Sequence, residues 1–388
     1  MRSGEMRISR KNQALRYNSP MNHIKLYAYD HHPIPFDFKQ TIERFFVEEI
    51  PLYDFTGSGN YLILKIKKTD MSTWKLITVL AKATGLQERD IGYAGLKDKS
   101  ATTIQYISLP KTYEKELNKN LTTERVEILE RTYNRAPIKI GHLKGNRFSI
   151  VLHRVAQNDA KFFNTTAKKM QTGGIPNYYG YQRFGEDSRS YLQGKEIAHS
   201  GKRLKGSREK LLVSAYQSHL FNQWLASRVK LSKVIAKEKP DIAAKKLNYP
   251  LELVKVLGKQ PQFFKLFMGD IVMPYPYGKM NFVKDMLHSA LMFKQAKISP
   301  TGLLCGATAL RAKSDAYHLE EAFDDTELNA LKGDRRFAWI WPKEVETMYE
   351  IDRQKLKVDF YLPKGSYATT FLEEIGKFSL KDTITLHK

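Results

Sequence analysis

Hydrophobic and polar residues alternate with a period of two in four segments of the chain: 44–50, 61–66, 102–109 and 145–155. In the first of these, Phe45 and Val47 would share one face, and Phe46 and Glu48 the other. Successive side chains of a β-strand point to opposite faces of the sheet, so this spacing is typical of strands with one buried face. The pattern therefore predicts a β-strand in each segment.

Other segments repeat their apolar positions every three or four residues, as an amphipathic helix does. The segments with this spacing are 72–84, 158–171, 207–258 and 315–332. Ser72 can cap the first helix, and Gly85 suits its end because glycine readily adopts the left-handed conformation. Strands and helices interleave without a strict strand–helix–strand alternation, which predicts the α+β class with a mainly antiparallel sheet.

The character of the sequence changes twice along its 388 residues. Helical patterns dominate after residue 173, and strand patterns resume from Arg336. A chain of this length is suited to two domains. We therefore expect a helix-rich domain inserted between two parts of a sheet domain.

The chain carries 64 lysines and arginines against 41 aspartates and glutamates, which gives a formal net charge of +23. The basic residues are dispersed rather than gathered in one tail, and this indicates a folded basic surface. Such a surface favours nucleic acid as the partner, ahead of an anionic membrane. A soluble basic protein without a polyanionic partner remains an alternative.

Cys305 is the only cysteine. One cysteine excludes an intrachain disulfide and a multi-cysteine metal site, and it suits a reducing cytoplasm. No apolar run approaches the roughly 18 residues that a membrane span needs, and no apolar stretch follows the basic N-terminal residues as in a secretory signal. We expect a cytoplasmic protein.

The segment 92–108, GYAGLKDKSATTIQYIS, places Asp98 between Lys97 and Lys99. Its Lys99-Ser100 pair resembles the end of a phosphate-binding loop, but Asp98 stands where that loop needs glycine to wrap a phosphate. Two interpretations of Asp98 remain open. It is either a solvated acid paired with its lysines, or a carboxylate whose pKa the neighbouring cations lower, so that it can act as a nucleophile or base.

Other residues that could carry chemistry have simpler explanations. His23, His31 and His32 lack the regular spacing of metal ligands and are expected at the surface. His219 lies on a helical stripe and is expected to pack in the core. The aromatic cluster 177–185, NYYGYQRFG, could stack RNA bases or pack at a domain junction, and both remain open.

Six segments form an ordered set along the chain: RFFVEEI, GYAGLKDKSATTIQ, LKGNRFSIVLH, PNYYGYQRFG, LLVSAYQSHLFNQ and LPKGSYATTFLEE. In this order they resemble the sequence blocks of the TruD family of tRNA pseudouridine synthases, and the likeness covers nearly the whole chain. One such segment would be weak evidence, whereas six in the family's order are specific.

The resemblance implies that Asp98 is the catalytic aspartate of an enzyme, and it places six further residues around a substrate uridine. These are Phe45, Asn146 and Tyr367, which would line the pocket, Phe148, which would stack on the base, and Lys39 and Glu49, which would lie in the same neighbourhood. Relatives commonly have phenylalanine where this chain has Tyr367, and the additional hydroxyl would need a hydrogen-bond partner or water.

The resemblance also implies a fold and a function. The fold would be a mixed, mainly antiparallel pseudouridine-synthase sheet domain of residues 1–173 and 339–388, with an inserted α/β TRUD domain of residues 174–338. The enzyme would isomerise a uridine to pseudouridine at position 13 of tRNA. The reaction involves no redox change or hydrolysis, so no cofactor and no metal are expected. The partner would be tRNA, with no membrane and no protein partner, and the chain would act as a monomer.

Two other classes of protein share part of this pattern. A non-catalytic RNA-binding or RNA-chaperone protein would have the same basic surface, but the intact Asp98, Asn146 and Phe148 favour catalysis. A peripheral membrane protein would need a basic amphipathic helix, which the sequence lacks.

Overall fold

The computed structural model describes residues 25–381 except for residues 122, 186 and 205. The chain forms two compact units. Within the described range, the first, which we call the sheet unit, comprises residues 33–171, 342–368 and 378–381. The second, which we call the mixed unit, comprises residues 25–32, 172–341 and 369–377.

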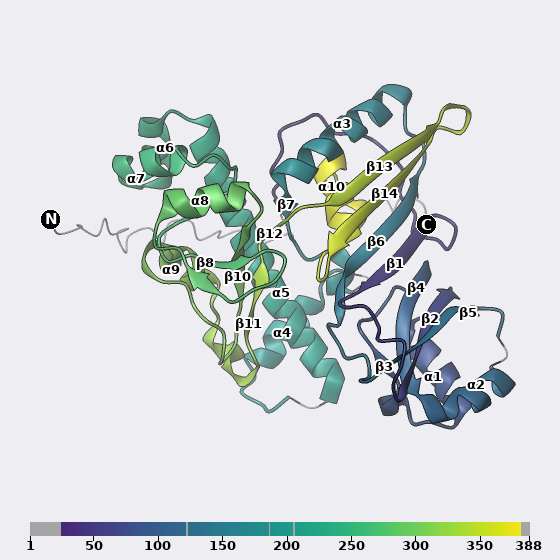
Figure 1. Cartoon of the computed structure of the whole chain (residues 1–388). Coiled ribbons are helices and arrows are strands. Elements are labelled where there is room, and N and C mark those ends of the chain that lie inside the picture. Colours follow the sequence, from purple (N-terminus) through teal and green to yellow (C-terminus); the bar gives the residue numbers. More distant parts are fainter. Residues whose placement is uncertain (1–24, 122, 186, 205, 382–388) are drawn as a thin grey trace. The chain divides into compact units, whose positions relative to one another are not determined.

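The sheet unit is built on one eight-stranded sheet (Figure 1). In spatial order its strands are β13 (Lys343–Glu350), β14 (Lys355–Pro363), β6 (Leu143–Leu152), β1 (Phe45–Pro51), β4 (Thr102–Pro110), β2 (Tyr61–Thr69) and β5 (Val126–Asn134), and the short β3 (Gly92–Tyr93) pairs with β4. Only β1 and β4 are parallel, and the other neighbours are antiparallel. The expected α+β class with a mainly antiparallel sheet is confirmed.

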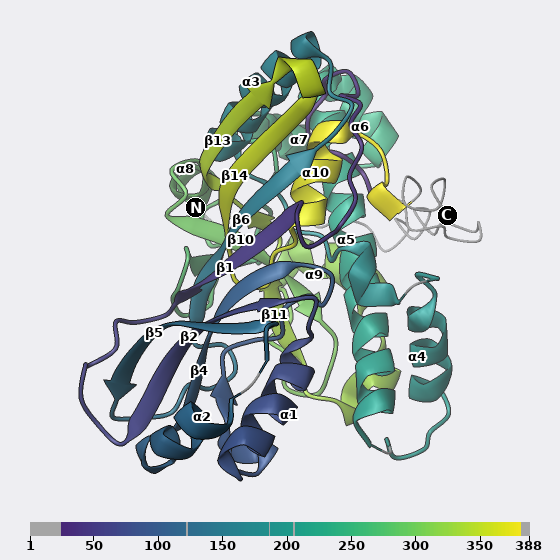
Figure 2. The same cartoon turned by 90° about the vertical axis from the view of Figure 1, so that its right-hand side faces the viewer.

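One face of this sheet carries the core of the unit. Leu62, Leu64 and Ile66 of β2 are fully buried and pack with residues of α1 (Thr73–Thr84) and α2 (Glu114–Asn120). A third helix, α3 (Gln157–Gly173), lies on the far side of β13 and β14 in Figure 2. Alternation along β2 therefore sends Leu62, Leu64 and Ile66 toward the helices, as the period-two pattern predicts, while Ile63 belongs to a smaller apolar cluster on the opposite face.

Helix α1 begins and ends where its sequence indicates. The side chain of Ser72 accepts a hydrogen bond from the backbone N–H of Lys75 at 3.2 Å, and Gly85 ends the helix with φ +79°. The buried face consists of Leu76, Ile77 and Leu80 with their neighbours. Trp74 lies outside that face and keeps 56% of its surface exposed.

The mixed unit contains most of the helices: α4 (Ser190–Ala198), α5 (Gly206–Lys237), α6 (Pro240–Leu247), α7 (Leu251–Gly258), α8 (Met286–Lys294), α9 (Ser314–Glu320) and α10 (Ala368–Gly376), whose first residue belongs to the sheet unit. Its antiparallel four-stranded sheet has the order β11 (Asp334–Phe337), β10 (Ile298–Leu304), β8 (Ile271–Pro274) and β9 (Asn281–Phe282), and β12 (Trp339–Ile340) pairs with β7 (Ile175–Pro176). Phe221 and Trp224 of α5 belong to the largest apolar cluster of this unit.

The helix expected over residues 315–332 is too long. Helix α9 ends at Glu320 and is followed by two short 3₁₀ turns, Glu321–Phe323 and Thr326–Ala330. Asp325 explains the break, because its side chain caps the second turn by accepting from the backbone N–H of Glu327.

The predicted domain division stays a prediction, but four described segments assigned to the sheet domain lie in the mixed unit: residues 172–173 and 339–341 at the predicted boundaries, and the longer segments 25–32 and 369–377. A buried pair of glutamates on α10 joins the two longer segments. Glu374 accepts from the backbone N–H of Tyr29 at 3.0 Å, and Glu373 pairs with Lys25. Such contacts between segments far apart in the chain leave no local pattern in the sequence.

Candidate active site

Asp98 lies in the connection between β3 and β4, which we call the Asp98 turn, in an exposed position of the sheet unit. Two hydrogen bonds hold the main chain of this turn. The backbone N–H of Lys97 donates to Thr73 Oγ1 at 2.9 Å, and Lys68 Nζ donates to the carbonyl oxygen of Asp98 at 3.1 Å. The turn is thereby fastened to the start of α1 and to the end of β2.

Lys68 is a fully buried cation beneath this turn. Its ammonium also donates to the carbonyl oxygen of Met71, so it is held by backbone oxygens rather than by a carboxylate. Burial lowers the pKa of Lys68 to about 8, the charge of Asp98 opposes this decrease, and Lys97 adds to it. A buried ammonium so close to Asp98 favours the ionised form of that carboxyl.

The pKa of Asp98 is raised above the ordinary aspartate value because protein atoms shield its carboxyl from water. A hydrogen bond with the Gln40 side chain and the charges of Lys68 and Lys97 act in the opposite direction. The residue as a whole remains exposed, so water moderates the increase. The expectation that neighbouring cations give Asp98 a lowered pKa is therefore wrong in direction, since shielding outweighs the cations.

Lys97 is the centre of a buried polar group formed with two of the predicted site residues. Its Nζ lies 2.6 Å from Glu49 Oε2 and donates to Asn146 Oδ1 at 2.9 Å. Glu49 and Asn146 are paired neighbours on β1 and β6, so the sheet register presents both to one cation. Lys97 thus binds Glu49 directly, instead of standing beside Asp98 as a solvated partner.

The predicted aromatic residues of β1 and β6 contact one another. The rings of Phe45 and Phe148 meet edge to face with centroids 6.1 Å apart, and Phe38 contacts Phe45 in the same way at 5.9 Å. Phe148 is also stacked on Phe360 at 5.3 Å and is only 7% exposed. One face of the Phe148 ring is therefore occupied by a protein neighbour.

Lys39 and Tyr367 are placed less directly. Lys39 is exposed and precedes Gln40, the residue whose side chain bonds to Asp98, so its segment passes beside the turn. Tyr367 is partly buried and lies between β14 and α10. Its position in the uridine pocket stays a prediction.

Several residues of this site were not predicted: Gln40, Lys68, Thr73 and Gln105. Gln105 is fully buried, and its Oε1 accepts from Thr73 Oγ1 at 3.0 Å. Its Nε2 has no hydrogen-bond partner within the part of the chain that the structure describes. The sequence contained one indication of a buried polar site here: two polar residues, Thr103 and Gln105, share the strand face that continues with Ile107 and Leu109.

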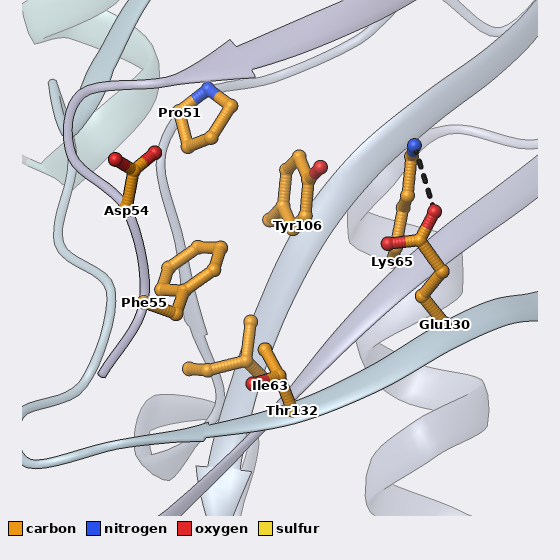
Figure 3. A pocket seen from close by; sticks show the side chains of 8 residues that line it. All are labelled: Pro51, Asp54, Phe55, Ile63, Lys65, Tyr106, Glu130 and Thr132. Atoms are coloured by element: carbon orange, nitrogen blue, oxygen red, sulfur yellow. Dashed lines mark hydrogen bonds and ion pairs between the residues drawn. The ribbon is translucent and has the colours of Figure 1, made fainter. Parts of the chain in front are cut away.

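Two hollows of the sheet unit differ from this site in their linings, although the second shares Phe148 with it. The first, about 160 Å³, is lined by Pro51, Asp54, Phe55, Ile63, Lys65, Tyr106, Glu130 and Thr132 (Figure 3). Ile63 and Lys65 alternate with Leu62 and Leu64 along β2, so the hollow is on the opposite sheet face from α1.

The second hollow, about 270 Å³, is rich in carboxylates: it is lined by Phe46, Glu48, Arg147, Phe148, Ser149, Glu344, Glu346, Asp359 and Phe360. Such a lining repels an anionic ligand. Neither hollow suits the phosphates of RNA.

No group of three or more histidine, cysteine, aspartate or glutamate residues that could hold a metal ion occurs within the described residues. His31 Nε2 donates to the carbonyl oxygen of Ile375 at 2.8 Å, and His23 lies outside the described residues. His219 is buried and stacked on Tyr191 with ring centroids 3.8 Å apart, as expected of a core residue. None of the described helices has the length and apolar character of a membrane span.

Comparisons with known proteins identify the family of the chain. The family model described as tRNA pseudouridine synthase D (TruD) matches residues 22–203 and 188–375. The tRNA pseudouridine synthase D of a Nitratiruptor species is 45% identical over 359 residues, which are 92% of this chain and 99% of that protein. The protein of the same name from Wolinella succinogenes is 42% identical over 359 residues, with the same shares covered.

A solved structure has the same fold. The crystal structure of a putative tRNA pseudouridine synthase D from Methanosarcina mazei superposes with a TM-score of 0.66 at 22% identity, and it covers 92% of this chain and 97% of its own. At this identity the likeness shows the fold alone. Together, the matches place the chain among the pseudouridine synthases, which are isomerases. Within that class, the chain belongs to the TruD family, tRNA pseudouridine synthase D.

Proposed function

We propose that this chain converts a uridine of tRNA, at position 13, to pseudouridine, and that Asp98 is its catalytic aspartate. The observation that carries the residue assignment is the anchored turn: Asp98 is an exposed residue in a turn whose main chain is held by Lys68 and Thr73. Family membership supports the reaction, and the names of the relatives support tRNA as substrate.

The isomerisation detaches uracil from the ribose at nitrogen and rejoins it through carbon. Asp98 would serve as a nucleophile toward the ribose or the base, or as the base that removes a ribose proton, and each of these roles needs the ionised carboxylate. Lys68 and Lys97 favour that form against the effect of shielding. The chemistry requires no electron transfer.

Asn146 would orient the uracil. An ammonium can only donate, so Lys97 requires the carbonyl oxygen of the Asn146 amide and leaves its NH₂ group as a donor. A uracil carbonyl oxygen is the matching acceptor. Glu49 fixes Lys97 by an ion pair of 2.6 Å, and thereby acts on the pocket through Asn146 rather than by direct contact.

The substrate must leave its base stack to reach Asp98, which is why an aromatic pocket is required. Phe45, Phe148 and Tyr367 would provide it. Dispersed lysines and arginines would hold the tRNA backbone. We propose that the chain acts on tRNA as a monomer in the cytoplasm.

The test is Asp98→Asn, which preserves the shape of the side chain but removes its charge and nucleophile. Incubation with unmodified tRNA and mapping at nucleotide resolution should show no pseudouridine, whereas the wild type modifies position 13. Binding of tRNA should be unchanged or slightly tighter, because a negative charge has been removed from the surface that faces RNA.

The matched control is Asp54→Asn, an exposed aspartate that lines the hollow on the opposite face of the sheet and should retain full activity. Substantial turnover by a folded Asp98→Asn protein would reject the catalytic assignment. A wild type that binds and anneals RNA without forming pseudouridine would favour the RNA-chaperone alternative.

A further inference from the structure

Trp74 is the one tryptophan of the chain that water reaches freely. It is 56% exposed, whereas the other three tryptophans, Trp224, Trp339 and Trp341, are at most 4% exposed. A large aromatic side chain gains free energy by burial, so an exposed one is a candidate contact for a partner where its position beside a functional residue supports this.

Trp74 lies beside the Asp98 turn. It follows Thr73, whose hydroxyl holds the backbone N–H of Lys97 at 2.9 Å. Its ring meets Tyr93 edge to face with centroids 5.9 Å apart, and Tyr93 is the last residue of β3 before the turn. An edge-to-face contact supports the indole ring while leaving ring surface open to another group.

The same turn exposes a second apolar side chain. Leu96, two positions before Asp98, is 58% exposed. Scattered exposed apolar residues are common on proteins and need no explanation. Trp74 and Leu96 differ from that background because the Lys97–Thr73 hydrogen bond brings their segments together at the predicted catalytic residue.

The local charge suits RNA. The first turn of α1 contains Lys75, which is exposed, and no acidic residue. The start of a helix carries a partial positive charge from its free N–H groups. Such a surface attracts the phosphodiester backbone of RNA. An aromatic ring with an open face in turn attracts RNA bases.

We infer that Trp74 is a stacking platform for an unpaired RNA base that flanks the target uridine. This inference rests on the proposed role of Asp98 for its place next to the target. When the target uridine leaves the stack, its neighbours lose a stacking partner, and the indole ring replaces that partner. Trp74 is thus a substrate-positioning residue, and its effect is on binding of RNA rather than on the chemical step.

Tryptophan fluorescence tests the contact directly. Because the other three tryptophans are buried, acrylamide quenching of the wild-type chain reports mainly on Trp74. Saturation with an unmodified tRNA transcript should reduce the quenching constant toward that of the Trp74→Phe variant. Unchanged quenching at saturating tRNA would overturn the inference.

Affinity measurements then identify the chemistry. Trp74→Ala should weaken tRNA binding and raise KM by about five- to a hundredfold, the range expected for one base stack, with kcat little changed. Trp74→Phe keeps a ring and should restore most of the affinity. Phe162→Ala, which removes a 65% exposed aromatic of α3, is the matched control and should bind as the wild type does.

Transcripts with an abasic site next to the target separate base stacking from other contacts. An abasic flank should weaken tRNA binding by the wild type. It should not weaken binding by Trp74→Ala any further, because the abasic site and the substitution remove the same interaction. Additive losses of binding free energy from the substitution and the abasic site would overturn the inference. So would acrylamide quenching that changes with protein concentration in the absence of RNA, because it would show that self-association covers Trp74. These binding measurements do not require turnover. An active Asp98→Asn variant would reject the Asp98 assignment, whereas the binding results alone decide the Trp74 inference, so the two failures can be distinguished.

Discussion

Asp98 and Lys68 illustrate how single residues set the chemistry of this site. Shielding raises the pKa of the Asp98 carboxyl, and the Gln40 hydrogen bond and the charge of Lys68, a buried ammonium that donates to backbone oxygens, act against this increase. A buried lysine without a carboxylate partner is costly to the folded chain. Its position under the Asp98 turn offers a functional reason for that cost.

Lys68→Met should lower kcat by about ten- to a hundredfold, because a slightly misplaced reacting group loses that much rate. It should also move the acid limb of the pH–rate profile to higher pH. Asp98 must be ionised to act, Lys68 lowers its pKa, and loss of that charge therefore raises the pKa further. Steady-state rates measured from pH 3.8, the ordinary pKa of aspartate, up to about pH 8 cover the acid limb and measure both effects.

The control for this change is the neighbouring lysine. Lys67→Met removes a partly exposed charge that pairs with Glu127 at 3.0 Å on the opposite face of β2. Its profile should match that of the wild type. An acid limb that stays in place in a folded Lys68→Met protein would show that Lys68 has only a structural role.

At this scale the sequence identified some contacts and missed others. Asp98, Glu49 and Asn146 were named through the family resemblance, and the structure joins the last two through Lys97. The partner of Lys97 could not be read from the sequence, because Glu49 is 48 positions away, from 97 − 49, and the two meet only in the folded sheet, where β1 pairs with β4, the strand that follows the Asp98 turn. Adjacency along the chain suggested Asp98 instead.

Among the secondary-structure elements, β6 positions the site most directly. It carries Asn146 and Phe148, and it lies between β1 and β14 (Figure 2). At Gly145 the strands approach so closely that an added Cβ would lie 2.2 Å from the carbonyl oxygen of Leu362. Glycine is therefore required at this point for the backbone of β14 to pair.

Gly145→Ala should reduce the free energy of unfolding by about 1–3 kcal/mol, the usual cost of forcing extra atoms into a packed region. Chemical denaturation followed by circular dichroism measures it. Gly95→Ala is the control, since a Cβ there meets nothing within 4 Å. Equal stability of Gly145→Ala and the wild type would contradict the close approach of β6 and β14.

Element prediction succeeded where local pattern and burial agree. Helix α1 has both of its expected end residues, and β4 buries Thr103, Gln105, Ile107 and Leu109 as the alternation predicts. It failed for residues 315–332, where a capping aspartate ends the helical run. The strands β8 and β9 were not predicted because four and two residues carry too little periodicity, and β10 was not predicted because Pro300 and Gly302 interrupt its alternation.

For the whole chain, composition and pattern alone predicted a division into two parts. The contacts also divide the chain into two units, but they attach residues 25–32 and 369–377 to the mixed unit through buried ion pairs and backbone contacts. Such attachments follow from tertiary packing. The net charge, in contrast, follows from the composition of the full sequence, so it predicts association with a polyanion without knowledge of tertiary contacts.

The charge of +23 predicts that tRNA binding is electrostatic at its base. Each phosphate contact releases counterions, so the logarithm of affinity should fall linearly with the logarithm of salt concentration, by about 0.7–0.9 per contact. Lys75→Met should reduce this slope by about one contact if the start of α1 meets the backbone. Lys67→Met, on the opposite sheet face, should leave the slope unchanged. Filter-binding titrations from low to physiological salt measure the slopes, and a flat response of the wild type would contradict a phosphate-binding surface.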